Sequence, residues 1–210
     1  LRLSDLRLPV EGEPIGAEQH PVFRSFWGMT SPYGQQMRLA DTILTGKPYP
    51  IKAMLVSGGN PVAAWPDSRK WKRAFSALDL LVVSDLFLSE TARIADVVLP
   101  VCSSVETLGL AHNYALTMGI PVVMLDRRLI DPLGESKPDW WIFSELGRRM
   151  GYGDLFPWDT EEEVVGHMLE PSGISLDQLE EHPEGIMYGE RETRVKGAFR
   201  TPSGKIELYS

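Results

Sequence analysis

Short apolar runs alternate with amphipathic segments through the middle of the chain. Three runs, Lys52–Ser57, Leu80–Asp85 and Ala95–Pro100, are rich in valine, leucine and alanine and end at turn-forming or polar residues. Runs of this kind are typical of strands in a parallel sheet that is covered on both faces. The segment between the first two runs, Pro66–Ala77, has apolar residues at helical spacing. We therefore predict an α/β fold with a doubly wound, mainly parallel sheet and helices on both faces, in a Rossmann-like, three-layer arrangement.

A longer helix is predicted over Ser136–Gly151. Ser136 is a candidate N-cap, and Pro138 falls in the first turn, where its missing N–H costs nothing. Asp139 would lie near the positive end of the helix dipole, which stabilises its negative charge. The glycine at the end of the segment is a typical helix terminator.

Further helix and strand signals lie outside this region. Gln35–Leu44 has helical spacing of its apolar residues. Capping-box patterns at Thr160–Glu163 and Ser175–Gln178 predict two more helix starts. The glutamate run at Glu161–Glu163 is more typical of a solvated first turn than of a metal site. The end of the chain, Phe199–Tyr209, predicts a turn that leads into a strand.

Composition and charge restrict the classes of function. Hydrophobic residues make up 43% of the chain and charged residues 24%, as in ordinary globular proteins. Residues 151–210 contain 13 acidic and five basic residues, whereas residues 1–150 contain 16 of each. This distribution predicts no nucleic-acid partner, because such a partner needs a basic surface. No apolar run approaches the roughly 20 residues of a membrane helix, so we predict no direct membrane insertion. A chain that begins at Leu1 is expected to be a fragment or processed product, which leaves the compartment open.

The sequence predicts no self-contained catalytic centre and no metal site. The single cysteine, Cys102, excludes an internal disulfide and any cluster held by several cysteines, and it is expected to be a small, partly buried residue. The G-x-G-x-x-G fingerprint, the P-loop and the G-x-S-x-G elbow are all absent. The four histidines never fall at the spacing of metal ligands; they are His20, His112, His167 and His182.

The turn after the first predicted strand is a candidate binding element. It reads Gly58-Gly59-Asn60-Pro61. Ligands of parallel sheets bind beyond the carboxyl ends of the strands, where glycines allow the backbone N–H groups to approach closely. Asn60 adds one donor group and one acceptor. The alternative is an ordinary turn that terminates the strand.

A second candidate element follows the next predicted strand, at Ser84 and Asp85. A carboxylate at this position can accept hydrogen bonds from sugar hydroxyls or from the N–H edge of guanine. The alternative is that Asp85 caps a short helix over Ser89–Ile94. From the residues alone, the two elements predict a nucleotide-like ligand.

At this point the sequence resembles a known family, the molybdopterin oxidoreductases, also called the dimethyl sulfoxide reductase family. The similarity extends from about Thr45 to the end of the chain through five ordered blocks. These blocks are Thr45–Pro61; Leu81–Pro100; Glu106 with Gly109 and Asn113; Gly134–Glu135 with Lys137–Trp140; and Phe199–Ser210.

The resemblance implies a piece of a large catalytic subunit. Such subunits hold molybdenum or tungsten between two molybdopterin guanine dinucleotides, and this chain is similar to their third, α/β domain. Residues 1–50 are then a lead-in from the preceding domain, 51–185 the cofactor-binding domain, and 186–210 a connection towards the C-terminal domain. The chain alone is expected to be inactive, with the metal-ligating residue and any iron–sulfur cluster outside it. The implied partners are the remaining domains of the same subunit and an iron–sulfur electron-transfer subunit.

The resemblance also implies contacts to the dinucleotide at six positions. Gly59 and Asn60 match the turn that approaches it, Ser84 and Asp85 match the pair at its nucleotide portion, Asp139 matches an acid that closes over it, and Thr107 stands where some relatives have a cofactor-contacting lysine. Tyr114–Leu116 replaces an arginine-containing stretch of the family. These last two departures remove positive charge, so the diphosphate would depend more on backbone N–H groups and helix ends.

Two other classes of function remain open. Related domains occur in electron-transfer complexes as structural domains of subunits that have lost the metal cofactor. Asn60, Ser84, Asp85 and Asp139 argue against this scaffold role, whereas Thr107 leaves room for it. A stand-alone nicotinamide-dependent enzyme is disfavoured by the missing glycine fingerprint.

Overall fold

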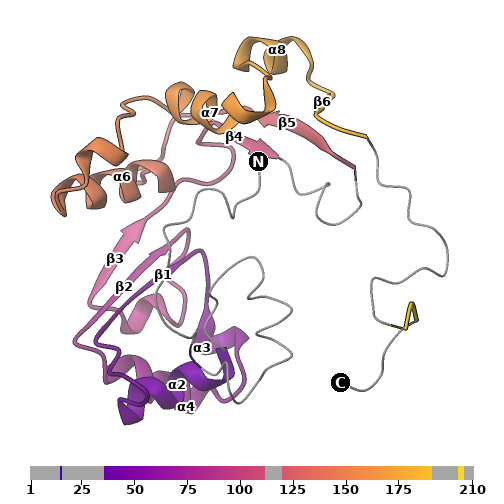
Figure 1. Ribbon diagram of the computed structural model, residues 1–210. Coiled ribbons are helices and arrows are strands. Elements are labelled where there is room, and N and C mark those ends of the chain that lie inside the picture. Colours follow the sequence, from indigo (N-terminus) through magenta and orange to yellow (C-terminus); the bar gives the residue numbers. More distant parts are fainter. Residues whose placement is uncertain (1–14, 16–35, 112–119, 191–202, 206–210) are drawn as a thin grey trace. The chain divides into compact units, whose positions relative to one another are not determined.

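The computed structural model describes Ile15 and residues 36–111, 120–190 and 203–205 (Figure 1). The chain divides into two compact units, Leu1–Val101 and Cys102–Ser210. The predicted boundaries after residues 50 and 185 stay predictions. Asn113, Tyr114 and most of the predicted C-terminal turn and strand lie outside the described residues.

The first unit contains a three-stranded parallel sheet. Its strands are β1 (Ala53–Ser57), β2 (Leu80–Asp85) and β3 (Val97–Pro100), in the order β1-β2-β3. Val56 pairs with Val83, and Val83 in turn with Val98. The prediction of an α/β fold built on a parallel sheet is confirmed, and all three strands lie where the apolar runs predicted them.

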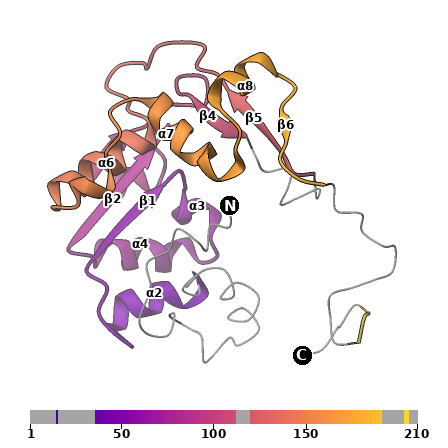
Figure 2. The ribbon, with the colours of Figure 1, turned by 45° about the horizontal axis from the view of Figure 1, so that its top comes forward.

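Helices of the first unit connect and cover these strands. They are α2 (Gln36–Thr45), α3 (Pro61–Ala64), α4 (Ser68–Ser76) and the 3₁₀ turn η2 (Ala92–Ile94). Asp67 begins α4, because its side chain accepts a hydrogen bond from the Lys70 N–H at 3.0 Å. Figure 2 shows α2 alongside α4.

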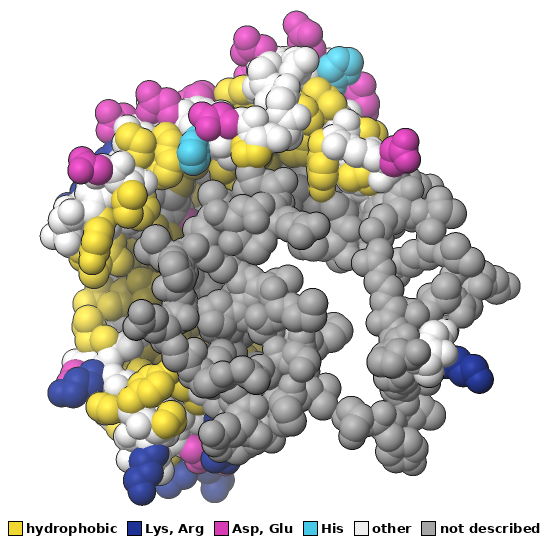
Figure 3. Space-filling view, viewed as in Figure 1, with side chains coloured by type: hydrophobic (Ala, Val, Ile, Leu, Met, Phe, Trp, Pro, Cys, Tyr) yellow, Lys and Arg dark blue, Asp and Glu magenta, His cyan; other side chains and the backbone are white. Residues whose placement is uncertain are grey.

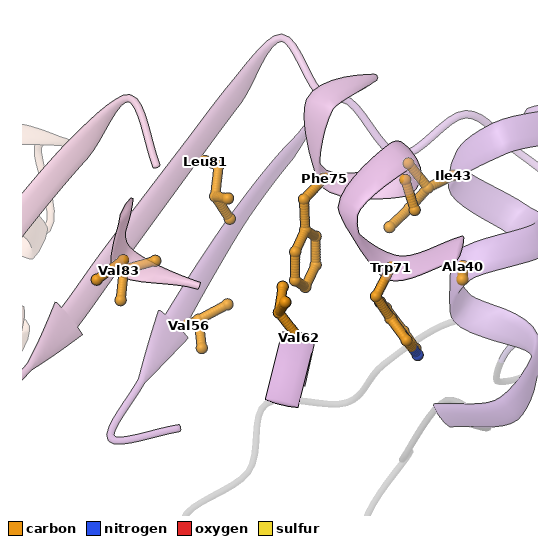
Figure 4. Close-up of a cluster of buried hydrophobic side chains, with 10 residues drawn as sticks. Ala40, Ile43, Val56, Val62, Trp71, Phe75, Leu81 and Val83 are labelled. Carbon is orange, nitrogen blue, oxygen red and sulfur yellow. The ribbon is translucent and has the colours of Figure 1, made fainter. Parts of the chain in front are cut away.

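The core of the first unit forms between α4 and the sheet. Phe75 is 2% exposed and lies among side chains from β1, β2 and α3 (Figure 4). The Trp71 ring packs against it in a tilted arrangement, with ring centroids 5.3 Å apart. The buried members of this cluster are Ala40, Ile43, Val56, Val62, Trp71, Ala74, Phe75, Leu81, Val83 and Ala92. A core of this size fixes the strand ends from which the candidate residues project.

The second unit contains short antiparallel strands that the sequence analysis did not predict. They are β4 (Gly109–Ala111), β5 (Val122–Asp126) and β6 (Ile186–Met187), in the order β4-β5-β6. The outer strands are only three and two residues long, too short for a periodic pattern to emerge from the sequence.

The helices of the second unit follow their predicted caps with one exception. They are α6 (Asp139–Arg149), η3 (Gly153–Leu155), α7 (Glu161–Leu169), η4 (Glu170–Ser172) and α8 (Leu176–Glu181). Both capping boxes, at Thr160 and Ser175, are confirmed. The prediction that Ser136 caps α6 is wrong. The N-cap is Pro138, and the Ser136 hydroxyl donates instead to the Leu133 carbonyl at 2.8 Å.

The core of the second unit lies between α7, α8 and the strands. Its buried members are Val123, Val165, Leu169 and Leu179.

The uneven charge of the sequence is visible on the surface of each unit. Figure 3 shows Lys and Arg side chains gathered over α4, and Asp and Glu side chains over α7 and α8. Within the described ranges, no helix is long and apolar enough to cross a membrane.

Candidate functional site

The carboxyl ends of β1 and β2 lie side by side and bring four of the six predicted residues to one edge of the sheet. Ser57 pairs with Ser84, and the Gly58 N–H donates to the Ser84 carbonyl at 2.9 Å. The turn that follows β1 and the loop that follows β2 therefore start at the same level. We call Ser57–Pro61 together with Ser84–Thr91 the carboxyl edge.

The turn after β1 needs glycine at Gly58 rather than at Gly59. Gly58 has a φ of +59°, a conformation that residues with a Cβ rarely adopt. A Cβ at Gly59 would meet the Val56 side chain at 3.8 Å, which is ordinary contact. Gly59 therefore lies at the predicted place, but the described residues do not exclude a side chain there.

Asn60 connects the two halves of the carboxyl edge. Its Oδ1 accepts hydrogen bonds from the Thr91 N–H at 3.2 Å and from the Thr91 hydroxyl at 2.8 Å. Its Nδ2 donates to Glu90 Oε2 at 2.5 Å. This bond is the main reason that the pKa of Glu90 lies below its ordinary value. The amide orientation of Asn60 is thus fixed by partners on both sides.

Thr91 is fully buried, and its hydroxyl serves two elements. It donates to Asn60 and accepts from the Val62 N–H at 3.1 Å. Thr91→Val keeps the shape of the side chain but removes the partner of the buried Val62 N–H, and Asn60 Oδ1 keeps only its bond from the Thr91 N–H. We expect it to lower the free energy of unfolding by about 1–3 kcal/mol, measured by urea denaturation.

A matched control for that substitution is Thr45→Val. The Thr45 hydroxyl donates to the Asp41 carbonyl at 2.7 Å but is exposed. In the variant, water can therefore bond to the Asp41 carbonyl in place of the hydroxyl. We expect a change within about 0.5 kcal/mol. Equal losses for the two variants would show that the Thr91 hydroxyl does not hold the edge together.

Asp85 fixes the loop that follows β2. Its Oδ1 accepts from the Phe87 N–H at 3.2 Å, and its Oδ2 accepts from the Ser89 hydroxyl at 3.0 Å. The Asp85 side chain therefore holds the loop, and the alternative that it caps a helix over Ser89–Ile94 is wrong, because η2 begins at Ala92 with Thr91 as its N-cap. Each carboxylate oxygen retains a further lone pair that could accept a bond from a ligand.

The buried hydroxyl of Ser84 is an unusual feature of the carboxyl edge. The residue is 1% exposed, and its Oγ finds no hydrogen-bond partner among the described residues. Buried polar groups are nearly always satisfied, so this orphan group calls for an explanation. A bound ligand that reaches the end of β2 is one.

In the second unit, Thr107 is held by a buried glutamate. Its hydroxyl donates to Glu161 Oε1 at 2.9 Å, and the Leu108 N–H donates to Glu161 Oε2 at 3.0 Å. Arg128 lies 3.8 Å from the same carboxylate. The prediction that the whole run Glu161–Glu163 is solvated is therefore wrong for Glu161, which is 9% exposed. Glu161 is the first residue of α7 and lies on the buried face of this helix, so its carboxylate contacts the residues just before β4.

A second buried glutamate anchors the segment before β4. Glu106 accepts from the Ser103 hydroxyl at 2.6 Å, the Ser103 N–H at 2.8 Å and the Leu133 N–H at 2.7 Å. These bonds, the Ser103 hydroxyl first, hold the pKa of Glu106 below its ordinary value. A lowered pKa means that the carboxylate stabilises the fold above its unfolded pKa, and this contribution is lost as pH falls through the lowered value.

Asp139 is the first residue of α6 and is exposed. Its carboxylate lies where the helix dipole favours negative charge, as predicted. The next residue, Trp140, has a buried indole Nε1 without a partner among the described residues. In the described part of the chain, two buried polar side-chain atoms lack a partner. Ser84 Oγ lies next in sequence to the predicted contact Asp85, and Trp140 Nε1 next to the predicted contact Asp139.

Cys102 and the acidic side chains provide no metal site in the described part of the chain. No group of three or more histidine, cysteine, aspartate or glutamate residues is arranged to hold a metal ion there. Cys102 is partly buried, as predicted, and burial raises the pKa of its thiol.

Sequence reasoning missed the roles of three residues, Glu90, Thr91 and Glu161. The first two lie in the block Leu81–Pro100 that carried the family resemblance, which was the available signal. Their function of orienting Asn60 depends on a contact across about 30 positions in the chain. Such a contact leaves no periodic trace.

Comparisons with known proteins agree on one family. A family model described as molybdopterin oxidoreductase matches residues 26–149. The chain is 32% identical over 183 residues to the probable oxidoreductase YyaE of Bacillus subtilis, covering 86% of this chain and 27% of that protein. It is 39% identical over 175 residues to the F420-dependent formate dehydrogenase subunit alpha of Methanocaldococcus jannaschii, covering 76% of this chain and 24% of that protein.

A solved structure gives the same result. The fold matches acetylene hydratase from Pelobacter acetylenicus with a TM-score of 0.73 and 26% identity, over 93% of this chain and 29% of that one. The chain therefore spans about a quarter of the length of these relatives.

Proposed function

The chain belongs to the molybdopterin oxidoreductase family, and from this premise we propose that it binds the dinucleotide portion of a molybdopterin cofactor within a larger oxidoreductase subunit. The proposed cofactor is a molybdenum or tungsten bis-(molybdopterin guanine dinucleotide). The single observation that carries the proposal is the carboxyl edge, where the ends of β1 and β2 bring Gly59, Asn60, Ser84 and Asp85 together.

The residues of this edge fit a nucleotide. Ser84 has a buried hydroxyl that lacks a partner among the described residues, and Asp85 has lone pairs to spare beyond its two loop contacts. Asn60 carries a second amide hydrogen that could donate to the ligand. Thr107 and Asp139 stay predicted contacts from the resemblance, and the Thr107 hydroxyl would first have to leave Glu161.

In this proposal the residues of the chain bind and orient. The cofactor supplies the redox chemistry when it is bound, and the protein contributes its position and electrostatic surroundings. Asn60 is oriented by three hydrogen bonds, two from Thr91 and one to Glu90. We propose that the 210 residues alone are inactive and contain no stoichiometric molybdenum, tungsten or iron, which elemental analysis can test.

The substrate does not follow from the relatives. Their names include a thiosulfate reductase subunit, a formate dehydrogenase subunit and acetylene hydratase, which act on unrelated molecules. The partners that we propose are the remaining domains of the same subunit and an iron–sulfur electron-transfer subunit.

Asp85→Asn in the full-length subunit tests the proposal. The amide keeps an acceptor for the Phe87 N–H, and the Ser89 hydroxyl can turn to accept from the new amide group, so the fold should survive. Loss of a charge-assisted bond to the nucleotide should cost about 1.5–3 kcal/mol, which weakens binding roughly tenfold to a hundredfold. We expect dinucleotide content and activity to fall together, and Asp139→Asn tests the other predicted acid separately.

Two outcomes contradict the proposal. Full cofactor content and full activity in both variants would favour the scaffold role instead. Unfolding of Asp85→Asn would mean that Asp85 acts mainly as a cap of its loop. Circular dichroism of the same preparations separates these two outcomes.

A further inference from the structure

Glu90 is a carboxylate of the carboxyl edge that the six predicted contacts do not include. It is exposed, and its Oε2 accepts from Asn60 Nδ2 at 2.5 Å. It thereby lies directly beside one of the proposed nucleotide contacts.

The loop that carries Glu90 is held at both ends. At its start, Asp85 accepts from the Phe87 N–H and the Ser89 hydroxyl, and at its end the buried Thr91 bonds to Asn60 and Val62. A backbone fixed in this way can present a side chain to a ligand with little loss of entropy on binding.

The two carboxylates of the edge differ in exposure, because Asp85 is half-buried and Glu90 is exposed. Both oxygens of Asp85 already accept a bond within the loop. The Glu90 carboxylate bonds to Asn60 through Oε2 and also accepts its own backbone N–H, but its exposed oxygens keep further lone pairs for a ligand. The bond from Asn60 and then the bond from the Glu90 N–H lower the pKa of Glu90, with smaller contributions from the positive charges of Arg93 and Lys72, so the carboxylate is ionised at neutral pH.

We infer that Glu90 accepts the vicinal hydroxyls of a ribose in the bound nucleotide, and the inference rests on the proposed function above. A carboxylate with free lone pairs can accept two neighbouring hydroxyl groups at once. A hydroxyl can also accept the second amide hydrogen of Asn60, so that a sugar satisfies both members of the Glu90–Asn60 pair. Glu90 is then a sugar-recognising residue, beside the proposed contact of Asp85.

Nucleotide titrations of the 210-residue chain followed by NMR test this assignment. The ligands are guanosine monophosphate, its 2′-deoxy and 2′,3′-dideoxy forms, and adenosine monophosphate. The variants are Glu90→Gln, which keeps an acceptor for Asn60 but removes the charge, and Glu162→Gln, at an exposed position of α7, as the matched control.

We expect Glu90→Gln to weaken binding of guanosine monophosphate about tenfold or more, because a charge-assisted bond is lost. The dideoxy form should bind the unaltered chain weakly and show no further loss in Glu90→Gln. Glu162→Gln should leave every affinity unchanged, and adenosine monophosphate should show the same dependence on Glu90 as the guanine ribonucleotide.

Other results overturn the inference in distinguishable ways. If the ribonucleotide binds at the carboxyl edge with equal affinity to the unaltered chain and to Glu90→Gln, Glu90 only orients Asn60. If the loss in Glu90→Gln depends on the base and not on the sugar hydroxyls, Glu90 recognises the base. If no nucleotide binds at millimolar concentration, the proposed function fails and the inference fails with it.

Discussion

Replacing Gly185 with alanine is expected to lower the free energy of unfolding by about 2–5 kcal/mol. Gly185 precedes β6 with a φ of +89°, a conformation that strains any residue with a Cβ. The added Cβ would also lie 2.8 Å from the Val123 carbonyl oxygen and 2.6 Å from Met124 Cγ. The carbonyl belongs to β5 and cannot move without breaking the strand pairing. Urea denaturation followed by circular dichroism measures the loss.

Gly151→Ala separates the two causes of that loss. Gly151 has a nearly identical φ of +88°, but nothing lies within 4 Å of its added Cβ. We expect about 1 kcal/mol from backbone strain alone. If the two variants lose the same stability, β6 does not pack against β5 as described.

Phe75→Ala is expected to lower the free energy of unfolding of the first unit by about 3–5 kcal/mol. The ring is 2% exposed and touches side chains from two strands and from α3 (Figure 4). Its removal leaves a cavity that close-packed neighbours fill only in part. Hydrogen exchange of the β1 and β2 amides would report the loss locally.

Phe87→Ala is the matched control in the same unit. The Phe87 side chain is 77% exposed, so its loss should change stability by no more than about 0.5 kcal/mol. A larger effect of Phe87 than of Phe75 would contradict the described core.

The sequence predicted the first unit well, because its strands and helices have strong periodic signals. The apolar runs that became β1 and β2 contain buried residues, the run that became β3 pairs with β2 although most of its residues are exposed, and α4 keeps its apolar residues on one face. The short strands β4 and β6 depend on pairing with β5 rather than on their own sequence, so no local pattern predicted them.

The candidate site was predictable only in part. Strand ends and turn residues indicated Asn60 and Asp85, since Asn60 lies in the glycine turn after the first apolar run and Asp85 ends the second run. The roles of Thr91, Glu90 and Glu161 depend on contacts between segments far apart in the chain. Threonine and glutamate are mostly found on solvated surfaces, so these residue types alone do not predict a role in orienting Asn60 or in holding Thr107.

The most direct test of the central claim is a titration of the ¹⁵N-labelled chain with guanosine diphosphate, followed by amide chemical shifts. The account predicts weak binding, with the largest shifts at Gly59, Asn60, Ser84 and Asp85. Shifts confined to other parts of the chain, such as α7 and α8, or no shifts at millimolar ligand, would contradict it.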